Sequence, residues 1–167
     1  MTDGKGIIYR MATMDDLESL VDLRAAFLAE PVGADPSYPP LLEALRLYFA
    51  SALPTGEFMG YLAIAEGQVV ATSGMVIHRH PPRPSNLTGY EAYVMNMYTL
   101  PAWRGRGIAT ALLGNLIALA GKKGCQRLSL HATSVGRPIY TKAGFVPAEG
   151  EMRVDLPILD QPVRAGA

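Results

Sequence analysis

Two arginines and two glycines stand directly in front of an apolar segment in the sequence TLPAWRGRGIATALL, residues 99–113. Arginine guanidinium groups hold phosphate oxygens in a planar fork, and glycine lets the backbone approach a ligand closely. The apolar segment predicts a helix, whose first backbone N–H groups lack partners and carry the positive end of the helix dipole. We therefore interpret residues 104–107 as a phosphate-binding loop between a strand and a helix.

Other interpretations of this loop are open at the level of the sequence. A surface turn with solvated arginines contains the same residue types. A dinucleotide-binding fingerprint would match GRGIAT, but the third glycine is missing and the next predicted strand has no Asp or Glu near its end to hold a ribose. A P-loop is excluded more firmly, because the loop contains no Gly-Lys-Ser/Thr.

The elements that must position this loop follow the order β-α-α-β-β-β-α-β-α-β, which predicts an α/β fold with a mixed sheet. We predict strands over residues 6–12, 58–80 (two strands joined by a tight turn at 66–67), 90–100, 125–132 and 150–157. We predict helices over residues 13–28, 39–52, 108–121 and 135–145, with a loose tail at 157–167. The unit at 90–132 should be a right-handed parallel crossover, within a single domain of residues 1–167.

The composition is that of a folded domain: 49% of the residues are hydrophobic, 18% are charged, and the mean hydropathy is +0.14. Lys and Arg (15) equal Asp and Glu (15), which argues against nucleic-acid binding by bulk charge. The single cysteine, Cys125, excludes a disulfide framework and a multi-cysteine zinc site, and we expect no metal. We see no signal peptide and no apolar stretch long enough for a membrane span, so we expect a cytoplasmic protein.

The loop and its flanking segments resemble the GNAT superfamily of acetyl-CoA-dependent N-acetyltransferases. RGRGIA, residues 104–109, fits the pyrophosphate-binding motif Arg-x-x-Gly-x-Ala of that family. MYTLPAW precedes it, as at the end of the family's fourth strand, and GRPIYTKAGF follows, similar to the family's C-terminal signature. The resemblance covers roughly residues 7–156, with its specific part at 90–145, and implies a fold whose fourth and fifth strands splay apart.

The resemblance implies that acetyl-CoA is the cosubstrate. The backbone at the end of the fourth strand would bind the pantetheine arm, the loop and first helical turn would hold the pyrophosphate, and the last helix would lie along the cosubstrate. The implied residues are Met97, Tyr98 and Thr99 for pantetheine; Arg104, Gly105, Arg106, Gly107, Ile108, Ala109 and Thr110 for pyrophosphate; and Ser134, Arg137 and Lys142 for pantetheine or phosphates.

Tyr140 matches the family's tyrosine near the thioester sulfur, where a phenol with a pKa of about 10 can protonate the leaving thiolate. A core aromatic of the last helix is its structural alternative. The inner part of the fourth strand has no acid or histidine, so Glu91 and His131 are the two candidates for the general base, with Asn96 positioning a water. Each also has a structural alternative: Glu91 capping a strand end, and His131 bonding to backbone.

The implied reaction is direct acetyl transfer to the primary amine of a small-molecule acceptor. In the family the acceptor groove is shaped by two loops, here residues 30–40 and 80–89, whose proline content suits a small molecule better than a long peptide. A non-catalytic acyl-CoA sensor is the alternative, because the inner fourth strand lacks an acid. A nucleotide-binding oxidoreductase is a more distant one, and a homodimer is an expectation from the family alone.

Overall fold

One five-stranded sheet, in the order β1-β2-β3-β4-β5, organises the part of the chain that the computed structural model describes, residues 6–148 and Val154. The strands are β1 (Ile8–Met11), β2 (Phe58–Ala65), β3 (Gln68–Arg79), β4 (Tyr90–Thr99) and β5 (Arg127–Ser129). Neighbours from β1 to β4 are antiparallel, and β4 and β5 are parallel. The mixed sheet and the parallel crossover predicted from the sequence are confirmed.

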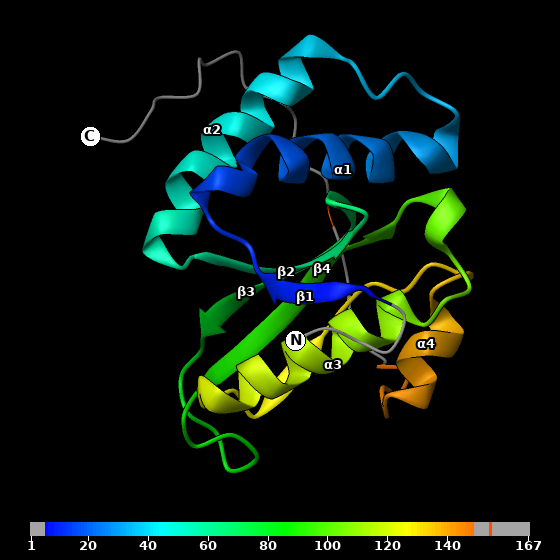
Figure 1. Ribbon diagram of the computed structural model, residues 1–167. Coiled ribbons are helices and arrows are strands. Elements are labelled where there is room, and N and C mark those ends of the chain that lie inside the picture. Colours follow the sequence, from blue (N-terminus) through cyan, green and yellow to red (C-terminus); the bar gives the residue numbers. More distant parts are fainter. Residues whose placement is uncertain (1–5, 149–153, 155–167) are drawn as a thin grey trace.

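Helices cover both faces of this sheet, as Figure 1 shows. They are α1 (Leu17–Ala29), α2 (Pro39–Thr55), α3 (Ile108–Lys122) and α4 (Arg137–Lys142), with single 3-10 turns η1 (Met14–Asp16), η2 (Glu30–Val32) and η3 (Pro101–Trp103). α1 and α2 lie on one face, and α3 lies on the other with α4 beside it (Figure 1). The helices and strands follow one another in the order that the sequence predicts.

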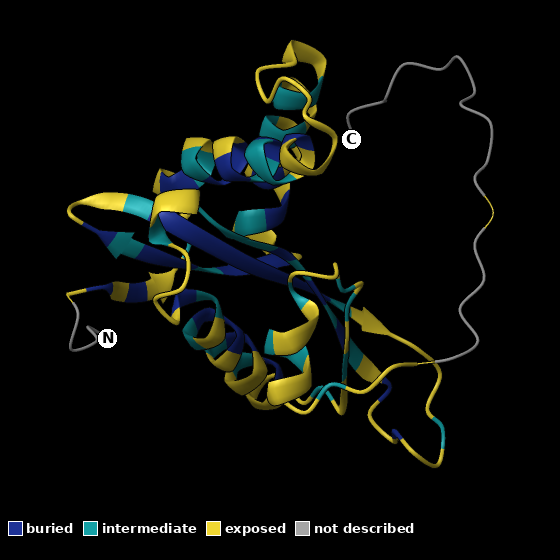
Figure 2. Cartoon of the chain, turned by 90° about the vertical axis from the view of Figure 1, so that its right-hand side faces the viewer, coloured by how far each residue is buried: buried dark blue, intermediate teal, exposed yellow. Residues whose placement is uncertain are grey.

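The core lies on both faces of the sheet, so β2 and β3 are buried along most of their length (Figure 2). Toward α1 and α2 the buried side chains are Leu20, Val21, Phe49, Ala52, Phe58, Leu62 and Val76. Toward α3 they include Ala63, Val70, Met59, Met75, Ala92, Val94, Ile108, Leu112, Leu113, Leu116 and Ala120. Each fully buried Leu, Phe or Met side chain contributes about 1.5–3 kcal/mol, and these two layers fix the helices on the sheet.

Local sequence signals set several of the element boundaries. Glu66 and Gly67 form the predicted hairpin turn with φ of 53° and 76°, the geometry of a type I′ turn that matches strand twist. Pro39 starts α2, as its missing N–H allows. The predicted strand at 125–132 is wrong in length, because β5 stops pairing with β4 after Ser129. The predicted last helix, 135–145, is also shorter, and the strand and tail expected at 150–167 lie outside the described residues, Val154 excepted.

β4 carries one extra residue relative to β3. Asn96 and Met97 of β4 together face the single residue Ser73 of β3, which makes a β-bulge. Asn96 has a φ of 54°, a left-handed conformation that asparagine tolerates better than most residues. Before the bulge, Tyr93 packs toward α1 and α2; after it, Met97 packs toward α3. The bulge therefore moves the odd-numbered side chains of β4 to the other face of the sheet.

The start of α1 is tied to β1 through a buried carboxylate. Asp16 is 5% exposed and accepts two hydrogen bonds of 2.7 Å from the guanidinium of Arg10. It also accepts the backbone N–H of Thr13 at 2.8 Å, as in a capping box. The hydrogen bonds from Arg10 hold the pKa of Asp16 below its ordinary value, although burial acts in the opposite direction.

Replacing Asp16 by Asn should lower the free energy of unfolding by about 1–3 kcal/mol, because Arg10 and the Thr13 N–H lose a charged acceptor. Since the folded-state pKa of Asp16 lies below the unfolded value of about 3.9, its contribution is fully present above about pH 4 and is lost as the pH falls through the folded-state pKa. Urea unfolding between pH 7 and pH 2 should therefore show a flatter pH dependence for D16N. Parallel pH profiles for the two proteins would contradict this assignment.

Candidate functional site

β4 and β5 separate after a short stretch of pairing, and this separation is the feature around which the candidate site forms. Only Glu91, Ala92 and Tyr93 of β4 pair with β5, and the last pair joins Tyr93 to Ser129. Beyond it, no described strand pairs with that side of β4. The backbone of β4 from Val94 onward is therefore open toward the end of the strand.

Tyr93 and His131 face each other across the point of separation. The phenol oxygen of Tyr93 lies 2.5 Å from Nδ1 of His131, and the two ring centroids are 5.7 Å apart. Tyr93 packs toward α1 and α2, while His131 is exposed two residues beyond the end of β5. A histidine oriented in this way by a phenol can take up a proton at the site.

Tyr140, on α4, is the third aromatic or histidine side chain of the candidate site. Its ring packs with the buried cluster against α3, 6.0 Å from the ring of Phe145. Gly136 is required beside it, because a Cβ there would come within 2.9 Å of the Tyr140 ring. Burial raises the pKa of Tyr140, and the neighbouring Tyr93 phenol raises it further. The Tyr140 phenol therefore stays protonated at neutral pH and can act as a proton donor.

The arginine–glycine loop links the end of β4 to the start of α3 through η3. Gly107, the residue before α3, has a φ of 85°, and a Cβ at this position would meet no other atom within 4 Å. The first intrahelical bond runs from the Ala111 N–H to the Gly107 carbonyl, and no side chain caps the helix. The amides of the first turn, residues 108–110, therefore have no intrahelical acceptor. Arg106 lies over the Trp103 ring, 4.5 Å from its centroid.

Arg104 connects this loop to the end of α1. Its guanidinium donates two hydrogen bonds to the carboxylate of Glu30, at 2.8 and 2.7 Å, and a third to the Thr99 carbonyl at 2.9 Å. Tyr98 donates its hydroxyl to the same carboxylate at 2.8 Å. Arg104 and Tyr98 hold the pKa of Glu30 below its ordinary value, while burial and the contact with Glu30 raise the pKa of Tyr98. Arg104 therefore fastens the connector that follows α1 to the end of β4.

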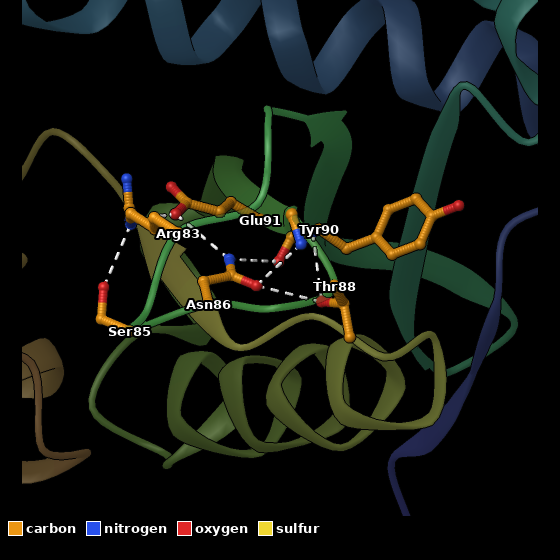
Figure 3. A network of polar contacts seen from close by, with 7 residues as sticks. Arg83, Ser85, Asn86, Thr88, Tyr90 and Glu91 are labelled. Carbon is orange, nitrogen blue, oxygen red and sulfur yellow. Dashed lines mark hydrogen bonds and ion pairs between the residues drawn. The ribbon is translucent and has the colours of Figure 1, made fainter.

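Glu91 lies at the start of β4, within a network that holds the preceding loop (Figure 3). Its carboxylate forms an ion pair with Arg83 and accepts a hydrogen bond from Asn86. Asn86 also accepts the backbone N–H of Gly89 at 2.9 Å. Glu91 lies two residues before Tyr93 on β4, and its carboxylate is already engaged by Arg83 and Asn86. This arrangement favours a structural role for Glu91.

The two loops expected to shape one acceptor groove lie at opposite ends of β4. The connector at 30–40 contacts Tyr98 and Arg104 through Glu30. The loop at 80–89 lies beside the start of β4, where Arg79 pairs with Tyr90. The structure does not bring them together, because the antiparallel pairing of β3 with β4 fixes the second loop at the other end of the sheet.

The remaining predicted residues lie on β4, in the loop after it, and on α3 and α4. Met97, Tyr98 and Thr99 form the end of β4 beyond the bulge, and Gly105 lies in the loop with a φ of 74°. Ile108, Ala109 and Thr110 form the first turn of α3. Ser134, Arg137 and Lys142 are exposed on α4 or just before it. Asn96, expected to position a water, is the buried residue of the bulge.

Tyr93 is a residue of the site that the sequence analysis missed. Glu91 and Tyr93 are two positions apart on β4, so their side chains share a face. The parallel pairing of β4 with β5 brings Tyr93, rather than Glu91, next to His131. The alternation of side chains along the strand already placed Tyr93 on the face of Glu91. Its contact with His131 could be predicted only by knowing which residues of β5 lie opposite β4.

Comparison with known proteins identifies relatives over most of the chain. The sequence model of the acetyltransferase (GNAT) family matches residues 18–145. Glucosamine 6-phosphate N-acetyltransferase 1 of rice is 26% identical over 152 residues, covering 89% of this chain and 88% of that enzyme. Glucosamine 6-phosphate N-acetyltransferase of Trypanosoma brucei brucei is 29% identical over 90 residues, and this match spans 54% of the chain and 59% of that enzyme.

Solved structures agree with this match. A predicted acetyltransferase from Clostridium acetobutylicum, crystallised with acetyl-CoA, has a TM-score of 0.81 and 32% identity, covering 89% of this chain and 96% of that one. A GCN5-related N-acetyltransferase from Ralstonia eutropha has a TM-score of 0.79 and 29% identity, covering 90% and 99%. The similarity therefore extends over the sheet, the loop and α4.

The described part of the chain carries neither a membrane-spanning helix nor a metal-binding cluster. None of its helices has the length and apolar character that a membrane span requires. Within the same residues, His, Cys, Asp and Glu nowhere gather in threes as ligands for a metal ion.

Replacing Glu91 by Gln should lower the free energy of unfolding by about 1–2 kcal/mol, because the ion pair with Arg83 is lost. Turnover with an accepted amine should change by less than about threefold, since the Glu91 carboxylate is engaged by Arg83 and Asn86. Urea unfolding and steady-state kinetics measure the two effects. A folded E91Q protein with a loss in kcat of about 100-fold would instead identify Glu91 as the general base.

Proposed function

Because the chain belongs to the GNAT family of acetyltransferases, we propose that it transfers the acetyl group of acetyl-CoA to the primary amine of a small-molecule acceptor. The observation that carries this proposal is the contact of Tyr93 with His131 where β4 separates from β5, with Tyr140 of α4 packed in the cluster against α3. The arginine–glycine loop follows at the end of the same strand. A thioester-bearing cosubstrate lying along β4 would reach from this loop to the three side chains.

The residues at the end of β4 and in the loop suit this cosubstrate. The side of β4 that lacks a strand partner at Met97 and Tyr98 would offer backbone hydrogen bonds to the amides of the pantetheine arm, in the manner of an added strand. The amides of residues 105–110 and the guanidinium of Arg106 suit the pyrophosphate, because they combine open N–H groups, a helix dipole and a positive charge. Arg104, directly before these amides, would add a second positive charge near the pyrophosphate. Ser134, Arg137 and Lys142, exposed on α4 or just before it, would border the same path.

The chemistry assigned to the chain is a pair of proton transfers around one acyl transfer. Acetyl-CoA supplies the thioester, whose C–S bond breaks as the amine nitrogen forms a bond to the acetyl carbon. In the tautomer that donates its Nδ1 proton to the Tyr93 phenol, His131 carries a lone pair on Nε2. Nε2 then accepts the proton that the amine loses. Tyr140 donates its proton to the departing sulfur. A backbone N–H at the Asn96 bulge stabilises the negative charge on the acetyl oxygen.

The names of the curated relatives suggest a first acceptor to test. Two of them are glucosamine 6-phosphate N-acetyltransferases, of which the rice enzyme aligns over most of both chains. Glucosamine 6-phosphate carries a primary amine on a small molecule, which agrees with the class of acceptor proposed here. It is therefore the first compound to supply together with acetyl-CoA.

Replacing Gly107 by Val should weaken acetyl-CoA binding at least about tenfold, because the side chain strains the left-handed backbone and covers the amides of the first turn. Gly124 provides a matched control, since it has a φ of 79° and open space around it but follows α3 at its far end. Titration calorimetry with acetyl-CoA should show G124V within about twofold of the parent protein. Unchanged affinity in G107V would refute the pyrophosphate assignment.

Replacing Tyr140 by Phe should lower kcat by roughly 100-fold while leaving acetyl-CoA affinity unchanged, because only the proton donor is lost. Thiol release from acetyl-CoA, followed with glucosamine 6-phosphate and a panel of other primary amines, measures the effect. Y90F is the matched control, since Tyr90 is exposed at the start of β4. Tight acetyl-CoA binding without thiol release for any amine would favour the sensor alternative.

A further inference from the structure

Arg24, on α1, is a partly buried arginine without a carboxylate partner among the described residues. Its guanidinium lies over the Phe27 ring, 5.3 Å from the centroid. By contrast, Arg10, Arg46, Arg83 and Arg104 each form an ion pair with an Asp or Glu. A guanidinium withdrawn from water without a counter-ion carries a desolvation cost, which a bound anion would offset.

The surroundings of Arg24 place it beside the proposed reaction centre. Burial lowers the pKa of Arg24, and the phenol groups of Tyr48 and Tyr93 are the titratable groups that act on its charge. Tyr93 is also the residue whose hydroxyl meets His131. Arg24 therefore lies on the α1 side of the sheet, over the Phe27 ring, which in turn packs edge-on against the ring of Tyr98 of β4 at a centroid distance of 6.1 Å.

The two tyrosines of the proposed site, Tyr140 and Tyr93, lie on opposite faces of the sheet. Tyr140, the proposed partner of the thioester sulfur, packs with the cluster against α3. Tyr93 packs with the cluster against α1 and α2. The acceptor amine must approach on the face of Tyr93 and His131, so the rest of the acceptor molecule lies within reach of α1.

We propose that Arg24 binds an anionic group of the acceptor, and that the acceptor is therefore an amine carrying a phosphate or a carboxylate. This inference rests on the proposed acetyl transfer and narrows the class of its acceptor. The N–H groups of a guanidinium form a fork that matches the oxygens of either anion. With its anion held at Arg24, the acceptor presents its amine to His131 on the same face of the sheet.

Calorimetric titration of the CoA-loaded protein with two matched pairs of compounds tests the inference. Glucosamine 6-phosphate against glucosamine tests a phosphate, and L-phenylalanine against L-phenylalanine amide tests a carboxylate. We expect the anionic member of one pair to bind at least about tenfold more tightly than its neutral partner. Equal affinities within both pairs, or no binding of either anionic compound, would overturn the inference.

Two variants of Arg24 test whether this residue causes the tighter binding of the anionic compound. R24Q should weaken binding of the preferred anionic compound at least about tenfold and leave binding of the neutral compound and of acetyl-CoA unchanged. R24K keeps the positive charge but lacks the paired N–H groups of a guanidinium, so it should retain part of the preference for the anionic compound. R24K therefore provides a second test if R24Q does not fold. R46Q is the matched control, because Arg46 is exposed and pairs with Glu18. An equal loss in R24Q and R46Q, or none in either, would exclude Arg24 as the anion site.

The binding measurement separates this inference from the proposed function. Binding of an anionic amine that depends on Arg24, without thiol release from acetyl-CoA, would refute acetyl transfer and retain the anion site. Thiol release with neutral amines at rates insensitive to R24Q would support acetyl transfer and reject the anion site.

Discussion

The short parallel pairing between β4 and β5 is the constraint on which the rest of the structure depends. Three residues of each strand pair, and the strands then part at Tyr93 and Ser129. Backbone N–H and C=O groups of a strand seek partners, so the open side of β4 is suited to an extended ligand. The helices on both faces hold β4 firmly through its side chains, which leaves only this edge available.

This constraint also organises the chemistry by face. α1 and α2 carry the side of the sheet with Arg24, Tyr93 and the adjoining His131, whereas α3 and α4 carry the side with the arginine–glycine loop and Tyr140. In an acyl transfer the attacking group and the leaving group lie on different sides of the carbonyl carbon. A site that opens between two strands of one sheet can therefore supply a proton acceptor from one face and a proton donor from the other.

The sequence predicted those features that depend on local patterns. The order of elements, the turn at Glu66 and Gly67, the start of α2 at Pro39 and the loop ahead of α3 follow from periodicity, proline geometry and glycine content. The contact of Arg104 with Glu30 joins residues 74 positions apart, and no local pattern encodes such a pairing. The length of β5 likewise depends on its neighbour, because a strand ends where its partner diverges. Glu91 and His131 could not be ranked as general base from the sequence, since each lies near a strand end and only the pairing of β4 with β5 shows that His131 meets the Tyr93 hydroxyl.

The bulge at Asn96 has a consequence for how this strand can evolve. One additional residue turns every later side chain of β4 to the other face of the sheet. Odd-numbered side chains before the bulge therefore face α1 and α2, whereas Met97 after it faces α3. If a related sequence lacked the extra residue, an alignment without a gap would pair residues that face α1 and α2 with residues that face α3. A deletion of the extra residue would therefore exchange the helical layers that the side chains after the bulge contact.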